Sequence, residues 1–347
     1  MKRIITVILS LAASLVVMAQ VRITTPETEL IIKADKGADL QILYFGARLS
    51  DADAANIEAA GVPGHSAYRA YGLWCASEAS LGVTHADGNL STSLKVESVM
   101  QSDVIDNSIV TKVVMKDAVY PFYVTVCYRA YQDVDMIETW TEIANLGKKP
   151  VTLTRFDSGY LPVRVGDVWL SHLHGTWAAE GLLVQEPLQR GMKVIKNKDG
   201  SRNSHTDHAE VMFSLDGKPQ ENTGRVIGAA LCYSGNYELR IDTRDTDYHE
   251  FYAGINPDNS SYKLESKEVF MTPELAFTYS DEGLSGASRN FHKWGRTYKL
   301  AHGDKLRKIL LNSWEGVYFD INEPGMDQMM ADIASMGGEL FVMDDGW

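Results

Sequence analysis

Two short segments near the C-terminal end of the chain combine tryptophan with carboxylates. The first is Trp314-Glu315, and the second contains Asp344, Asp345 and Trp347. A tryptophan ring stacks on the apolar face of a pyranose, and carboxylates accept hydrogen bonds from pairs of hydroxyl groups. The two segments therefore indicate a site that binds a sugar.

Each segment also has a simpler interpretation. Asp344-Asp345-Gly346 is typical of a polar turn after a strand, because Asp-Gly turns are common. Trp314 fits a core residue whose ring N–H is satisfied. Glu315 is expected to anchor the end of its strand through hydrogen bonds rather than to take part in catalysis. The elements that carry these residues decide between the interpretations.

Both segments end apolar runs that predict strands buried on both faces, Ile309–Trp314 and Leu340–Met343. A helix is predicted between them, because Pro324 suits its first turn and Gly337-Gly338 ends it. The predicted inner stripe of this helix consists of Met326, Met329, Met330, Ile333 and Met336. In a parallel α/β barrel the active site forms at the carboxyl ends of the strands, so this β-α-β unit would bring both segments to one rim.

A single β-α-β unit cannot cover its own strands, since parallel edges need neighbouring strands and the crossover helix needs a full sheet. We therefore expect residues 306–347 to be the first part of a (β/α)8 barrel, truncated after its second strand. The Leu340–Met343 strand would then present an unpaired apolar edge, which predicts poor solubility.

From Val21 to about Tyr279 the sequence has an all-β texture. Runs of alternating apolar residues recur between turn residues, as in Ser108–Lys116, Phe122–Tyr131, Met136–Asn145 and Val151–Phe156. In Phe122–Tyr131 the two-residue period predicts five inward-facing side chains, Phe122, Val124, Val126, Tyr128 and Ala130. The pattern is typical of a large antiparallel sandwich, which we assign to residues 20–285. Phe291 and Trp294 then predict a linker helix within residues 286–305.

Residues 1–19 are predicted to be a signal peptide. Lys2 and Arg3 precede an apolar run, and Val17-Met18-Ala19 offers small residues for cleavage before Gln20. The apolar run is shorter than the roughly 20 residues of a spanning helix, with a retained anchor as the alternative. We expect an exported protein, periplasmic or secreted, with no membrane attachment after cleavage.

The formal net charge of −13 argues against several partners. An acidic surface repels phosphate backbones and anionic lipid headgroups, so nucleic-acid binding is not expected and a neutral substrate fits better. Cys75, Cys127 and Cys232 are far apart and include no Cys-x-x-Cys pair, so neither a zinc site nor a disulfide framework is indicated. One disulfide with a spare thiol and three free thiols both stay open.

His172 and His174 lie on one face of a predicted strand, and such a pair can bind metal. The sequence offers no third ligand at a telling spacing. We therefore expect neither a metal nor another cofactor.

Several of these blocks resemble glycoside hydrolase family 36, the α-galactosidases. The resemblance depends first on Leu310–Asp320, which contains Asn-Ser-Trp-Glu, and on Glu339–Trp347, which contains Asp-Asp-Gly-Trp. Further segments resemble the family in the same order: His174–Glu180, Ser234–Tyr237 and Asn290–Trp294. The similarity covers most of the chain after residue 19, and the two C-terminal blocks together are specific.

The resemblance implies an N-terminal antiparallel β-supersandwich followed by a (β/α)8 TIM barrel and a C-terminal β-domain. It implies a retaining exo-α-galactosidase that hydrolyses terminal α-D-galactosyl residues of galacto-oligosaccharides. Asp344 and Asp345 would bind galactose hydroxyls, chiefly the 4-OH and the 6-OH, in a subsite walled by Trp314 and shared by Trp347. The family's nucleophile and acid/base are aspartates on later barrel strands, so we expect no catalytic residue in this chain and no turnover by it.

One segment departs from the family pattern. Many members carry a Gly-Asp-Phe-Arg-type loop that reaches the active site of a neighbouring subunit, and the corresponding Gly72–Ser77 lacks the aspartate and the arginine. A homo-oligomer of the full-length form stays open. So do two other functions, a carbohydrate-binding β-sandwich without catalysis and an α-N-acetylgalactosaminidase or galactosyl transferase on the same scaffold.

Overall fold

The computed structural model describes residues 20–59, 65–72, 78–163, 166–245 and 248–347. Two compact units divide the chain, Met1–Trp294 and Gly295–Trp347. We call the described part of the first unit the β-domain and the second the C-terminal unit. The signal peptide predicted at 1–19 lies outside the described residues.

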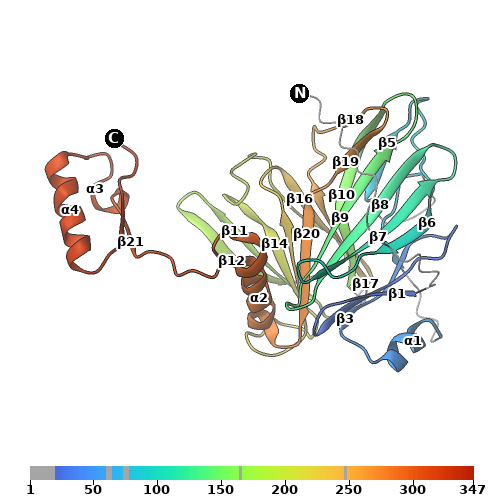
Figure 1. Cartoon of the computed structure of the whole chain (residues 1–347), viewed down its shortest axis with the longest axis horizontal. Coiled ribbons are helices and arrows are strands. Elements are labelled where there is room, and N and C mark those ends of the chain that lie inside the picture. The colour runs from blue at the N-terminus through green and yellow to red at the C-terminus, as the bar shows by residue number, and fades with distance from the viewer. Residues whose placement is uncertain (1–19, 60–64, 73–77, 164–165, 246–247) are drawn as a thin grey trace. The chain divides into compact units, whose positions relative to one another are not determined.

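The β-domain consists of antiparallel sheets (Figure 1). Its largest sheet has ten strands among the described residues, one of which pairs beside the main path. In spatial order they are β12 (Ala179–Pro187), β11 (Trp169–Thr176), β14 (Asp207–Ser214), β15 (Val226–Cys232), β20 (Glu274–Ser280), β9 (Ile137–Asn145), β8 (Phe122–Tyr131), β7 (Ser108–Asp117) and β6 (Leu94–Gln101), with β19 (Glu268–Met271) beside β9.

Two smaller sheets complete the β-domain. The six-stranded sheet contains β13 (Gly191–Lys196), β16 (Tyr237–Asp245), β17 (Tyr248–Ile255), β10 (Val151–Val163) and β18 (Tyr262–Leu264), with β5 (Leu81–Thr84) beside β10. The four-stranded sheet contains β1 (Gln20–Thr24), β2 (Thr28–Lys33), β3 (Gln41–Ala47) and β4 (His65–Ser66).

A single apolar core joins these sheets. Phe213 of β14 meets Phe251 of β17 with ring centroids 5.2 Å apart, and Phe156 of β10 meets Phe270 of β19 at 4.8 Å. Such edge-to-face pairs add to the free energy gained from burying apolar area. The large and the six-stranded sheet therefore pack face to face, as in a sandwich.

Strand β8 shows why the alternating runs fold as they do. Its bounds are those predicted, and its five predicted inward side chains are all buried. It pairs in register with β7 and β9, with Val126 opposite Val113 and Thr141. The prediction of an antiparallel β-sandwich is confirmed.

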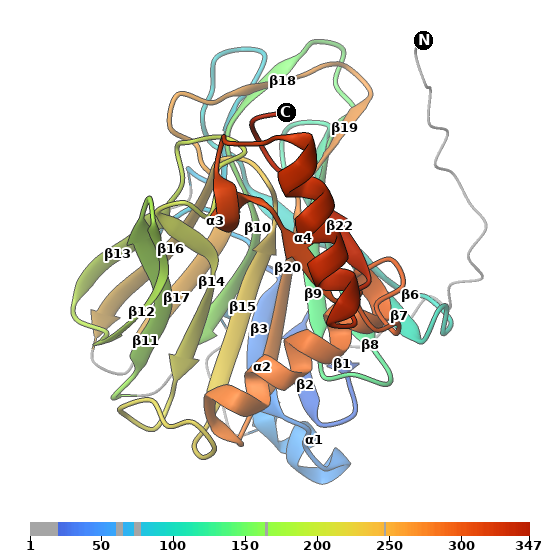
Figure 2. The same cartoon turned by 90° about the vertical axis from the view of Figure 1, so that its left-hand side faces the viewer.

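The β-domain also carries two helices. α1 (Asp51–Ala59) follows β3, and Ser50 Oγ accepts the Asp53 N–H at 3.1 Å at its start. α2 (Gly283–Trp294) packs on β15 and β20 (Figure 2). The chain continues as a π-helical turn, η1 (Gly295–Lys299). The predicted domain bounds of 20–285, 286–305 and 306–347 stay predictions.

The C-terminal unit is a β-α-β arrangement. Strands β21 (Leu310–Asn312) and β22 (Leu340–Val342) pair in parallel, with Leu311 opposite Phe341. Between them come a short helix, α3 (Trp314–Val317), and the crossover helix α4 (Glu323–Ser335). The prediction of a parallel α/β unit after the β-domain is confirmed.

Local signals set the limits of α4. Asn322 is its N-cap, with its side-chain oxygen accepting the Gly325 N–H at 2.9 Å, and Pro324 lies in the first turn. Gly337 follows the helix with φ +88°, in the left-handed region that favours glycine. The predicted helix is therefore confirmed together with its capping signals.

Two details of the prediction are wrong. The first strand of the β-α-β unit was predicted to run to Trp314, but β21 ends at Asn312. It ends there because Ser313 has helical dihedrals and the Asn312 side-chain oxygen accepts the Trp314 N–H at 2.8 Å. The inner stripe of α4 is also narrower than predicted. Met326 is buried, whereas Met330 and Met336 are exposed.

No helix among the described residues has the length and apolar character needed to span a membrane. The predicted signal peptide precedes the described residues, so this finding does not concern it.

Candidate functional site

The carboxyl ends of β21 and β22 meet, because the two strands run parallel and pair directly. The Ser313 N–H donates to the Val342 carbonyl at 3.0 Å, and the Asp344 N–H donates to Ser313 Oγ at 3.0 Å. The Asn312 side-chain N–H donates to the Asp344 carboxylate across the same gap. The two predicted sugar-binding segments therefore lie at one end of the two-stranded sheet.

The two neighbouring aspartates differ in their surroundings. Asp344 is half-buried, and one carboxylate oxygen accepts the Asp345 N–H at 2.7 Å. This N–H first, and the Asn312 amide second, lower the pKa of Asp344 below its ordinary value. Asp345 is exposed and accepts the Gly346 N–H at 2.9 Å. Both carboxylates thus keep lone pairs for further donors, such as sugar hydroxyls.

Trp314 is half-buried among aromatic rings. Its ring meets Phe319 edge to face at 4.9 Å and Tyr318 at 5.3 Å, and both partners are mainly exposed. These two contacts cover part of the ring and leave the rest open to solvent. Trp347 is 88% exposed, and Glu315 is exposed in the first turn of α3.

Three residues of this region were not singled out from the sequence. Asn312, Tyr318 and Phe319 lie within the predicted segment, but their roles depend on the turn that follows β21. An asparagine two residues before the tryptophan is the signal that indicates such a side-chain-to-backbone turn.

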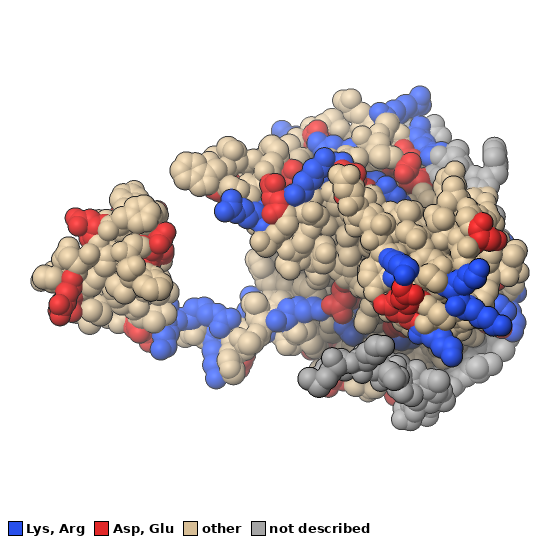
Figure 3. Space-filling view, turned by 90° about the horizontal axis from the view of Figure 1, so that it is seen from above, with Lys and Arg blue, Asp and Glu red and all other residues tan. Residues whose placement is uncertain are grey.

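The site has one sign of charge. Residues 309–347 contain eight acidic residues and no Lys, Arg or His. Figure 3 shows acidic side chains around this part of the C-terminal unit, whereas basic ones gather along residues 295–308, at the start of the same unit. These residues offer no cation to pair with a carboxylate, sulfate or phosphate on a ligand, so the arrangement favours a neutral one.

Models of two protein families match nearly the whole described chain. The Glycosyl hydrolase family 36 N-terminal domain matches residues 38–265, and Melibiase matches residues 269–347. The chain belongs to glycoside hydrolase family 36. The prediction made from the C-terminal blocks and the β-domain segments is confirmed.

Two curated family 36 relatives are α-galactosidases. The chain is 33% identical to alpha-galactosidase AgaA of Geobacillus stearothermophilus over 239 residues, which is 68% of this chain and 32% of that protein. It is 31% identical to alpha-galactosidase Mel36A of Lactobacillus acidophilus, again over 68% of this chain and 32% of the relative. The chain therefore spans about a third of the length of these relatives.

A solved family 36 structure has the same fold. It is a variant of AgaA from Geobacillus stearothermophilus in complex with raffinose, with a TM-score of 0.85 and 25% identity. The match covers 94% of this chain and 50% of the solved chain. The family 36 fold thus extends over both compact units of this chain.

Gly72–Ser77, the segment expected to correspond to the Gly-Asp-Phe-Arg-type loop, is only partly described. Gly72 has φ +109°, and a side chain on it would meet the Ser91 backbone at 2.4 Å. Residues 73–77, with Cys75, lie outside the described residues. Of the other cysteines, Cys127 is buried with a free thiol, and Cys232 is exposed.

The two histidines considered for metal have acidic partners in the β-domain. His172 of β11 lies 3.3 Å from Glu186, and His174 Nδ1 lies 2.8 Å from Asp207. Burial first, and Lys193 second, lower the pKa of His172 and so favour its neutral form. Across the described ranges, no group of three or more His, Cys, Asp or Glu side chains is arranged to hold a metal ion.

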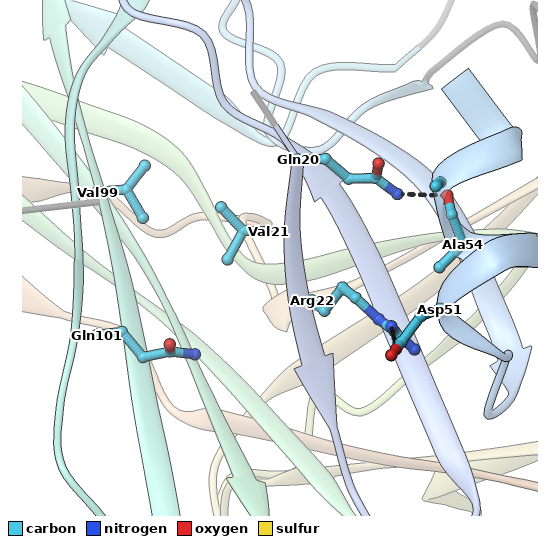
Figure 4. A pocket seen from close by; sticks show the side chains of 8 residues that line it. Gln20, Val21, Arg22, Asp51, Ala54, Val99 and Gln101 are labelled. Atoms are coloured by element: carbon cyan, nitrogen blue, oxygen red, sulfur yellow. Dashed lines mark hydrogen bonds and ion pairs between the residues drawn. The ribbon is translucent and has the colours of Figure 1, made fainter. Parts of the chain in front are cut away.

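A pocket of roughly 330 Å³ between β1 and α1 has a structural explanation (Figure 4). Its polar side chains already have partners in the protein: Arg22 pairs with Asp51 at 2.6 Å, Gln20 donates to the Ala54 carbonyl at 2.9 Å, and Gln101 donates to the Thr111 hydroxyl at 3.2 Å. The first two contacts attach the first strand to the helix, and the pocket offers no arrangement of groups for catalysis.

Proposed function

We propose that this chain is the N-terminal part of a retaining exo-α-galactosidase that removes terminal α-D-galactosyl residues from galacto-oligosaccharides. The observation that carries the proposal is the meeting of Trp314, Asp344 and Asp345 at the adjoining ends of two parallel strands. An aromatic wall beside two hydroxyl-binding carboxylates suits a pyranose. The α-galactosidase relatives, and the AgaA variant in complex with raffinose, support this class of substrate.

In this proposal Asp344 and Asp345 bind the 4-OH and 6-OH of galactose, and Trp314 and Trp347 contribute to the same subsite. Retention requires two carboxyls about 5–5.5 Å apart on opposite sides of the glycosidic bond, one ionised and one protonated. Asp344 and Asp345 are consecutive at one strand end, so they cannot enclose a bond between them. The nucleophile and the acid/base are proposed to be aspartates on barrel strands after residue 347.

The proposal includes a completed (β/α)8 barrel. β21 and β22 expose apolar side chains, with Leu310 49% and Leu340 40% exposed, and parallel strands are ordinarily covered on both faces. Further β-α units would cover these side chains and form the rest of the site. Residues 20–347 alone are then expected to bind galactose weakly and to turn over no substrate.

The test compares two proteins from the same gene. One ends at Trp347, and the other continues through the open reading frame to its stop codon. We expect only the longer protein to hydrolyse p-nitrophenyl α-galactoside, with α-galactose as the first product by NMR. In that protein Asp345→Asn should lower kcat/KM about 10- to 100-fold, because a hydrogen bond to a charged group contributes about 1.5–3 kcal/mol.

Two results would contradict the proposal. The first is hydrolysis by the protein ending at Trp347 that is lost in its Asp345→Asn variant. The second is a longer protein that neither binds galactose nor hydrolyses α-galactosides.

We also propose export, supported by the sequence of residues 1–19. Mass spectrometry of the protein recovered from its native host should find a mature chain that starts at Gln20. An intact N-terminus in the cytoplasmic fraction would contradict export and leave the enzymatic proposal unaffected.

A further inference from the structure

The side chain of Asn312 connects the two halves of the candidate site. Its oxygen accepts the Trp314 N–H at 2.8 Å, and its NH2 group donates to the Asp344 carboxylate. A backbone N–H can only donate, so the amide oxygen must face Trp314 and the NH2 group must face Asp344. One planar group therefore fixes the turn that carries the aromatic ring and the carboxylate on the neighbouring strand.

The contacts of Asp344 are divided between its two oxygens. One oxygen accepts the Asp345 N–H at 2.7 Å, and the other accepts the Asn312 amide. Its backbone N–H donates to Ser313 Oγ, whose residue is fully buried. The orientation of this carboxylate is thus set from β21 as well as from its own strand.

We propose that Asn312 is a positioning residue that holds the Trp314 turn and the Asp344 carboxylate together as one rigid galactose clamp. The inference rests on the proposed function, because it assumes that Asp344 accepts a galactose hydroxyl. Asparagine suits this role because it offers an acceptor and a donor on one short side chain. Aspartate keeps the acceptor and loses the donor, leucine loses both, and glutamine is one methylene longer.

The decisive variants are Asn312→Asp and Asn312→Leu in the protein expressed to its stop codon. Galactose affinity is measured by calorimetry from pH 5 to pH 8 and expressed relative to the wild type at each pH. At pH 8 both variants should bind galactose about 10- to 100-fold more weakly, the effect of losing one charge-assisted hydrogen bond. Two carboxylates then face each other in Asn312→Asp.

The pH dependence separates positioning from a purely structural role. As the pH falls, the two carboxylates of Asn312→Asp share one proton, which restores both the single charge and the hydrogen bond of the wild type. Its relative affinity should therefore recover toward pH 5, whereas Asn312→Leu stays weak throughout. Asp345 and Glu315 are the other titratable groups at these strand ends and occur in every variant, so the ratio cancels their effect.

Asn322→Ala is the matched control. It removes an asparagine of the same unit that caps α4 and makes its side-chain contact with Gly325. Its relative galactose affinity should equal that of the wild type at every pH, although its thermal stability falls.

The outcomes distinguish the two proposals. If the wild type binds galactose and Asn312→Asp stays within twofold of it at every pH, or is equally weak at every pH, the role of Asn312 is refuted. A wild type without galactose affinity refutes the proposed function and this role with it.

Discussion

The β-domain and the C-terminal unit use carboxylates in opposite ways. In the β-domain Arg240 lies 2.6 Å from Asp157, and both side chains are almost fully buried. Glu250 is fully buried and accepts hydrogen bonds from Arg69, Tyr160 and Tyr248. These buried carboxylates accept hydrogen bonds from side chains of the β-domain itself. At the ends of β21 and β22 the carboxylates are half-buried or exposed and keep part of that capacity for a ligand.

The two regions also differ in their apolar packing. In the β-domain the sheets share one buried apolar cluster. In the C-terminal unit, Met326 is the only buried apolar residue among those that the structure describes. The β-domain therefore has an apolar core of its own, whereas the C-terminal unit carries the candidate site and buries little apolar surface. The difference predicts where substitutions act on stability and where they act on binding.

The largest expected change in stability comes from breaking the buried ion pair of the β-domain. Arg240→Met removes the nearest cation from buried Asp157 and leaves Glu238 with Arg155 alone, which should lower the free energy of unfolding by about 3–5 kcal/mol. Urea denaturation followed by the circular dichroism of the β-sheets measures this loss.

An exposed ion pair provides the control for Arg240→Met. Arg225 and Asp216 are 48% and 41% exposed, so Arg225→Met should cost only about 0–1 kcal/mol. Equal losses in the two variants would show that burial does not decide the value of charge in this domain.

Methionine packing gives the second test, this time within the C-terminal unit. Met326→Ala empties an enclosed site and should destabilise α4 by about 2 kcal/mol or more. Met330→Ala, on the same helix but 40% exposed, should change stability by about 0.5 kcal/mol or less. Hydrogen exchange of the α4 amides distinguishes the two. If both variants exchange alike, the burial of Met326 does not stabilise α4.

The sequence predicts the β-domain well because its signals are repeated. β8 alternates over its whole length, and each neighbouring strand adds the same two-residue period, so single irregularities do not change the result. The order of the strands across the ten-stranded sheet could not be predicted from the sequence. Placing β20 between β15 and β9 depends on pairing between distant segments, for which alternation carries no information.

The site shows the opposite limit. Trp314, Asp344 and Asp345 were recognisable by residue type and by their position after apolar runs. The role of Asn312 was not, because a run ending in Asn-Ser-Trp suits a strand as well as a turn. Only the close approach of β21 and β22 puts its amide between Trp314 and Asp344.

The third test changes the aromatic wall and should affect binding more than folding. Trp314→Ala removes the ring that meets Phe319 and Tyr318, and galactose affinity should fall about 2- to 10-fold, the value of one aromatic contact. Trp314→Phe keeps a ring and should retain most of the affinity. Calorimetry with galactose, alongside the thermal unfolding of the β-domain, separates the two effects. A drop in β-domain stability without a change in galactose affinity would mean that Trp314 serves folding rather than binding.

The smallest expected effect comes from the cap of α4. Asn322→Ala removes the acceptor for the Gly325 N–H and should cost about 1 kcal/mol in the C-terminal unit, whereas Asn322→Asp keeps an acceptor and should cost little. Hydrogen exchange in the first turn of α4 measures the difference. The cap is at the start of the helix, and the site depends on the strand ends, so galactose affinity should stay unchanged in both variants. A parallel loss of affinity in Asn322→Ala would mean that the crossover helix, and not only the Asn312 contact, sets the distance between Trp314 and the aspartates.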